Sequence, residues 1–366
     1  MARLTKVLPK SRFLAALSFV YLFAFSSIYI QLPGLYGDNG IYPARLTNHA
    51  PLANLSDFYG DPDLLRLSPF LKLDTFQMLE LCVLIGIVFS FLAAFCESFR
   101  TLPVYLFLWL AYFSILKVGQ TFLWFQWDLL LVEAGFLALL LAKVAPGFSF
   151  SFTSGDRISI WLLRWLLFRL MFSAGVVKLR SNCPAWWSLQ ALHWHYQSQC
   201  IPTPLAWYFH HLPGWFHSLS VASTFIIEIL VPLLFFVPLK PVRLFCFYSQ
   251  VLLQVFIILT GNYNFFNLLT IALCYSLLTD DDFHSNGYQQ FVDYGPLPIH
   301  APCTGADYHT ARVLCLYSIK SILGLSWCDD WLSAGDLCYP QTPPSFTDSP
   351  CLLPHSNVPC LPILRE

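Results

Sequence analysis

Six ionisable side chains lie within stretches of sequence that are otherwise strongly apolar, and they are the first candidates for chemistry. A charge in an apolar medium is costly, so such residues are usually functional or paired with one another. They could form ion pairs that lock helices together, line a polar cavity, or line a transport pathway. The six are Asp128, Glu133, Arg164, Arg169, Lys178 and Glu228.

A second concentration of candidate functional side chains, Trp and His, lies in segment 179–218. Tryptophan favours the membrane interface, so the segment could lie on lipid headgroups. It is also common at binding hot spots, so the segment could instead bind a partner. The pair His193 and His195 could ligate a metal, but no third ligand has a suitable spacing, and we expect neither a metal site nor a cofactor. The partner-binding candidates are Trp186, Trp187, His193, His195 and Trp207.

Two covalent modifications are predicted outside the apolar stretches. Cys183 and Cys200 lie in the same segment and could form a disulfide, which requires an oxidising compartment. Asn54 begins the sequon Asn54-Leu55-Ser56, an acceptor for N-glycosylation.

The elements that hold these residues must be membrane helices. The chain has 366 residues, of which 57% are hydrophobic and 11% are charged, with a mean hydropathy of +0.59. Soluble domains carry about 25% charged residues, so this chain cannot cover a soluble surface. Its net charge of −1 excludes a polybasic nucleic-acid binder. We therefore predict an all-α, polytopic transmembrane bundle embedded in a lipid bilayer.

Apolar runs of suitable length predict about seven or eight spans. The final run is short and could be an eighth helix, a re-entrant hairpin or an interfacial helix. The predicted spans are 13–30, 76–95, 103–119, 121–142, 158–178, 219–238, 244–260 and possibly 265–278.

Basic residues orient this layout. The short connections 1–12, 96–102, 143–157 and 239–243 are rich in Lys and Arg, whereas the long connections 31–75 and 179–218 are poor in them. The positive-inside rule therefore predicts a cytosolic N-terminus, with 13–30 as a retained signal anchor. The sequon and the paired cysteines then face a lumen, most plausibly that of the endoplasmic reticulum.

The predicted orientation also fixes relative depths. Neighbouring helices run antiparallel and rise about 1.5 Å per residue, so Glu133 and Arg169 should lie at similar mid-membrane depth. Arg164 lies nearer the cytosolic edge and could extend its side chain towards water. Asp128 and Lys178 lie nearer the lumenal edge.

The chain divides into two parts. Residues 1–282 form a multi-pass membrane domain. Residues 283–366 are rich in Pro, Cys, Ser and Tyr without helical or strand periodicity, and we predict a short, irregular, disordered tail.

Six motifs in the membrane domain together resemble the lipase maturation factor family, closest to the second of its branches. The resemblance implies a non-enzymatic endoplasmic reticulum membrane protein that helps secreted lipases, such as lipoprotein lipase, to fold and assemble. The family's large lumenal domain has no counterpart in 283–366. The motifs are GLYGDNGIYPAR (34–45), FQWDLLLVEAGF (125–136), RWLLFRLMFSAGVVKL (164–179), CPAWW (183–187), TPLAWYFHHLP (203–213) and TGNYNFFNLLT (260–270).

A shorter motif, AGVVKL at 174–179, resembles the AGxxKL segment of vitamin K-dependent gamma-carboxylase. In that enzyme the matching lysine is the base that deprotonates vitamin K hydroquinone. The resemblance implies, as an alternative function, a membrane enzyme that uses Lys178 as its base, with Asp128 and Glu228 as candidate partners. A lysine can do such work in a site that excludes water.

Overall fold

The computed structural model describes residues 8–46, 62–119, 122–123, 125–145, 154–199, 201–279 and 282. The described residues form helices and their connections, and none of them belongs to a β-strand. The predicted all-α class is therefore confirmed. Asn54, Cys200 and the predicted tail 283–366 lie outside the described residues, so those predictions stay as they were.

Within the described residues, six helical segments are long and apolar enough to cross a membrane. One of them is composite, since α10 (Gly214–Phe225) continues through a π-helix η5 (Ile226–Leu230), α11 (Val231–Leu233) and η6 (Leu234–Phe236). The other five are α1 (Leu8–Tyr36), α3 (Thr75–Phe95), α4 (Leu102–Gly119), α6 (Ser154–Arg180) and α12 (Lys240–Thr260).

Two further helices are shorter than a full span and pack inside the same bundle. Helix α5 (Gln126–Leu141) begins later than the predicted span 121–142, because the Asp128 carboxylate accepts a hydrogen bond from the Phe125 N–H and caps the helix there. Helix α13 (Phe266–Cys274) continues as η7 (Tyr275–Leu277) and packs against α12, α1 and α6. The last apolar run is thus helical and embedded in the bundle.

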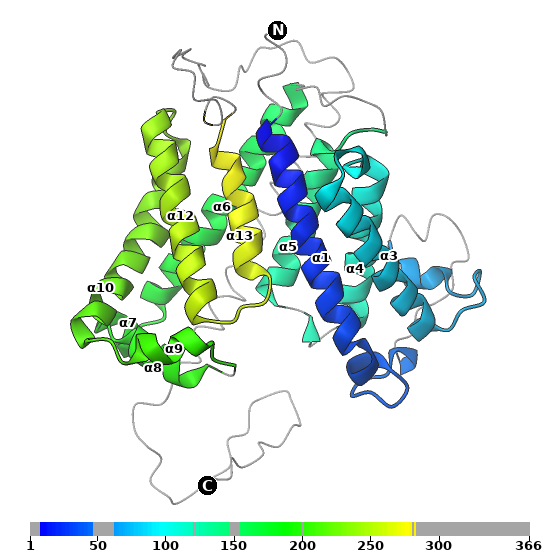
Figure 1. The fold of residues 1–366 in the computed structure, drawn as a ribbon, viewed down its shortest axis with the longest axis horizontal. Helices are drawn as coiled ribbons and strands as arrows, with labels where there is room; N and C mark the ends of the chain where they lie inside the picture. The colour runs from blue at the N-terminus through cyan, green and yellow to red at the C-terminus, as the bar shows by residue number, and fades with distance from the viewer. Residues whose placement is uncertain are drawn as a thin grey trace, which may run out of the picture.

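The helices form two groups that meet at α1, α5, α6 and α13 (Figure 1). Helix α1 packs along α3, and α4 along α5, whereas α6 contacts η5 and α12 contacts α13. Buried aromatic rings fill the group that contains α1 and α4: Tyr21, Phe25 and Tyr112 have ring centroids 5.8–6.1 Å apart.

Ion pairs lie at the starts of α1, α6 and α12, at one end of the bundle. Lys10 Nζ lies 2.9 Å from the Asp156 carboxylate, joining the starts of α1 and α6. Asp282, just beyond η7, lies 3.3 Å from Lys240 and 3.7 Å from Arg243 at the start of α12. Helix α13 therefore runs back towards the end of the bundle where α1 begins (Figure 1).

The opposite end carries three short helices. They are α7 (Pro184–Trp187), α8 (Ala191–Ser198) and α9 (Pro204–His210), and they connect α6 to α10 (Figure 1). The residue at the N-cap of α9, Thr203, accepts a hydrogen bond from Ala206 N–H and donates one to Leu259 O, 2.7 Å away. This contact fastens the short helices to the end of α12.

Candidate functional site

Glu133 and Arg169 form an ion pair between α5 and α6. Each side chain retains about a quarter or less of its exposure. The two residues were predicted to lie at similar depth, and the ion pair brings them together. Its partners satisfy each other, which is the structural role that the sequence left as one of three alternatives.

Lys178 lies near the end of α6 and is surrounded by acceptors. Its Nζ donates to both carboxylate oxygens of Glu228, at 2.6 and 2.8 Å, and to Ala174 O at 3.2 Å. It also lies 5.3 Å from the ring centroid of Trp186, a cation–π contact. Glu228 is 5% exposed, so the carboxylate that holds the lysine is largely removed from solvent.

The backbone around Glu228 is irregular, and residues on two neighbouring helices accommodate it. Glu228 lies in the π-helix η5, a type of segment that is rare and often marks functional sites. Gly175 on α6 faces it: a Cβ there would overlap the side chain of Ile229 and lie 3.1 Å from Glu228 Cβ. From α12, Gln250 Nε2 donates to Ile227 O at 2.8 Å and so satisfies a carbonyl of the irregular turn.

Arg164 caps a helix end. Its Nη2 and Nε donate to Ser276 O, at 2.8 and 3.3 Å, where α13 ends through η7. A cation at a helix C-terminus neutralises the partial negative charge of the last carbonyls. Arg164 therefore fixes α13 against α6.

Asp128 lies in a different site from Lys178. Its Oδ1 accepts a hydrogen bond from the Tyr112 hydroxyl at 2.6 Å, and its Oδ2 accepts one from Phe125 N–H at 3.2 Å. Among the described residues it forms no ion pair. The structure thus gives Lys178 one of its two candidate partners, Glu228, and assigns Asp128 to a pocket.

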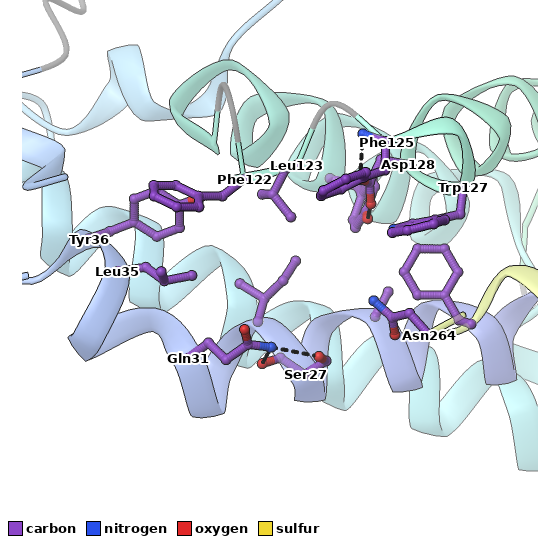
Figure 2. Close-up of a pocket in the computed structure, with 14 residues that line it drawn as sticks. Ser27, Gln31, Leu35, Tyr36, Phe122, Leu123, Phe125, Trp127, Asp128 and Asn264 are labelled. Atoms are coloured by element: carbon purple, nitrogen blue, oxygen red, sulfur yellow. Dashed lines mark hydrogen bonds between the residues drawn. The ribbon is translucent and has the colours of Figure 1, made fainter. Parts of the chain in front are cut away.

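That pocket has a volume of about 190 Å³ and lies between α1 and the start of α5 (Figure 2). Tyr36 and Phe122 stand at one end, and Trp127 and Asn264 at the other. Exposed Gln31 and Asn264 border it, whereas Asp128 is buried. The lining residues are Ala24, Ser27, Ile28, Gln31, Leu35, Tyr36, Tyr112, Phe122, Leu123, Phe125, Trp127, Asp128, Asn264 and Phe265.

The tryptophans of segment 179–218 divide into two groups. Trp186 packs inward, against Lys178 and at 5.8 Å from the ring of Phe225. The other rings project outward from the short helices and the start of α10. These exposed aromatic residues, called the aromatic surface below, are Trp187, Trp194, Trp207, Tyr208 and Trp215, each 62–68% exposed.

His193 and His195 turn to different neighbours. His193 packs against His217, with ring centroids 4.3 Å apart. His195 stacks parallel to Tyr263 at 6.1 Å and lies 3.1 Å from the Gln199 amide. Burial lowers the pKa of His195. No group of three or more potential ligands is arranged to hold a metal within the part of the chain that the structure describes.

Cys183 is the N-cap of α7 and forms no disulfide with another described cysteine. Cys200 lies outside the described residues. The pairing of the two therefore remains a prediction.

Several residues of these sites escaped the sequence analysis. Tyr112, Gln250 and Gln31 are uncharged, and a search limited to charges inside apolar runs passes over them. Their signal was present, since each is a polar side chain within a predicted span or close to its end. Asn264 lies in the polar interruption of the TGNYN motif and adopts a left-handed conformation, with φ of 54°.

Comparison with known proteins matches residues 8–285 to the lipase maturation factor transmembrane domain. The chain is 54% identical to lipase maturation factor 2 of chicken (Gallus gallus) over 276 residues, covering 75% of this chain and 39% of the relative. It is 52% identical to human lipase maturation factor 2 (75% and 40%) and 34% identical to human lipase maturation factor 1 (71% and 46%). The chain thus spans less than half the length of these relatives. No solved structure matches it.

Proposed function

Because the chain belongs to the lipase maturation factor family, we propose that it assists the folding, assembly and maturation of secreted lipases, such as lipoprotein lipase, in the endoplasmic reticulum membrane. The observation that carries the proposal is the extent of the family match, which includes every described helix of the bundle. The Lys and Arg bias supports a cytosolic N-terminus. The aromatic surface then faces the lumen, where secreted proteins fold.

The aromatic surface is the best candidate for contact with a lipase. Tryptophan and tyrosine bury large areas at low entropic cost and dominate protein interfaces. The bundle supports this surface rigidly, because Thr203 and Gln199 bind the end of α12 through Leu259 O and Thr260 O. The helices would thus hold a contact surface at the membrane.

Secreted lipase activity in cells that lack the endogenous factor tests this proposal. Rescue by the chain, and loss of rescue with Trp187→Ala and Trp207→Ala at unchanged abundance, would support it. Trp161→Ala is the matched control, because Trp161 is also exposed (40%) but lies on α6 within the spans. Failure of the unaltered chain to rescue activity or to co-purify with a lipase would refute the proposal for this chain.

The alternative function is a membrane enzyme in which Lys178 acts as a base on a quinone-like or lipid substrate. The position of Glu228 in a π-helix favours a specialised site. The contacts of Lys178 favour a structural role, because both carboxylate oxygens of Glu228 already engage its ammonium. The paired substitutions in the Discussion separate the two functions.

A further inference from the structure

The Asp128 pocket contains a carboxylate that has no compensating cation among the residues that the structure describes. Asp128 is 1% exposed, and its oxygens accept one hydrogen bond each, from Tyr112 and from Phe125 N–H. A carboxylate has room for about four acceptor contacts. A buried carboxylate with only neutral donors is poorly stabilised as an anion. A cationic group in the pocket would stabilise the charged form of Asp128.

Aromatic rings supply the remaining walls. Phe125 and Trp127 stack at 4.7 Å beside Asp128, and Tyr36 and Phe122 close the other end with centroids 6.3 Å apart (Figure 2). None of the residues that line the pocket is basic. Aromatic faces next to a carboxylate are the surroundings that recognise quaternary ammonium groups.

We propose that this pocket binds the choline headgroup of a phospholipid from the leaflet at the end of the bundle opposite Lys10. The ammonium would approach Asp128 beside the stacked rings of Phe125 and Trp127. This inference goes beyond lipase maturation and does not depend on it.

Size and position favour a headgroup over a larger ligand. Pockets for drug-sized ligands measure about 300–1,000 Å³, whereas this one measures about 190 Å³. Its border is close to the outer face of α1, where Ile30, next to Gln31, is 79% exposed. The acyl chains could therefore remain in the bilayer while the headgroup enters the pocket.

Native mass spectrometry of the full chain in detergent tests the proposal with two lipids that share their acyl chains, dioleoyl-phosphatidylcholine and dioleoyl-phosphatidylglycerol. We expect the choline lipid to bind about tenfold more tightly, since a desolvated cation–π contact and one charge pair are together worth at least that factor. Asp128→Asn should abolish this preference. Tyr112→Phe should retain it, because the carboxylate stays.

Two further variants keep the test decisive. Glu97→Gln removes one carboxylate at the other end of the bundle and should leave the preference unchanged. If Asp128→Asn does not fold, Phe125→Leu replaces an aromatic wall that is 47% exposed, and it should weaken binding of the choline lipid alone. Equal affinities for the two lipids would overturn the proposal, as would a preference that survives Asp128→Asn or, if that variant does not fold, Phe125→Leu. If free choline binds as tightly as the choline lipid, the part of the proposal that assigns the ligand to a phospholipid is overturned.

Discussion

The Lys178–Glu228 ion pair gives the sharpest prediction. Removing only the lysine, as in Lys178→Met, leaves the Glu228 carboxylate buried without its cation. Removing only the charge of the acid, as in Glu228→Gln, leaves the lysine without its counter-ion. Removing both charges leaves no stranded charge. We therefore expect the double variant to be more stable than Lys178→Met.

The magnitude follows from burial. Glu228 and Lys178 side chains are 6% and 22% exposed, so the pair is close to the buried limit. Breaking one partner of a buried pair costs about 3–5 kcal/mol, whereas replacing both can be nearly neutral. For a large domain about 1 kcal/mol shifts the melting temperature by roughly 2 °C. Lys178→Met should thus lower the melting temperature by roughly 6–10 °C.

Thermal denaturation in detergent, followed by size-exclusion chromatography, measures these shifts. Glu97→Gln is the control, because it breaks the ion pair with Lys143. The Glu97 side chain is 58% exposed, and such exposed pairs contribute at most about 1 kcal/mol. A double variant less stable than Lys178→Met would refute the reasoning.

The same variants separate the two functions. If Lys178 is structural, the double variant should recover lipase rescue together with stability. If Lys178 is a base, rescue should stay lost in the stable double variant, because a methionine cannot accept a proton.

Four other predictions follow from single contacts. Gly175→Val should lower the free energy of unfolding by about 1–3 kcal/mol through overlap with the π-helix, measured by thermal denaturation. Gln250→Leu should lower the free energy of unfolding by about 1–3 kcal/mol, because the part-buried Ile227 O would lose its donor, and Gln250→Glu should restore part of that stability at low pH, where the protonated side chain can donate. Asn54 should carry an endoglycosidase-sensitive glycan. An acceptor inserted well beyond Asp282 should stay unmodified, because Asp282 pairs with Lys240 at the end of the bundle where α1 begins. Glycosylation of the inserted acceptor would contradict that placement. Burial lowers the pKa of His195, so the unfolded chain binds a proton that the folded chain does not, and stability should fall as pH drops through about 6.5 and below. His195→Phe should flatten that pH profile.

Much of the membrane architecture could be predicted from local sequence. Apolar runs long enough to span a bilayer have few alternatives to a helix, because backbone groups in lipid must bond within their own segment. The depth argument placed Glu133 and Arg169 at similar depth, because helix rise is fixed and the two helices are neighbours, and their side chains form an ion pair. The sequence therefore determined an all-α bundle and part of its internal charge pairing.

Tertiary structure decided the remaining partners. Depth along a helix does not specify which direction a side chain faces. Lys178 therefore had two equivalent acidic candidates until the packing of α6 against η5 selected Glu228. Asp128 was directed to Tyr112 and an aromatic pocket by the contact of α5 with α4 and α1. The π-helix depends on Gly175 and Gln250 from separate helices, and no local pattern encodes a turn that distant residues stabilise.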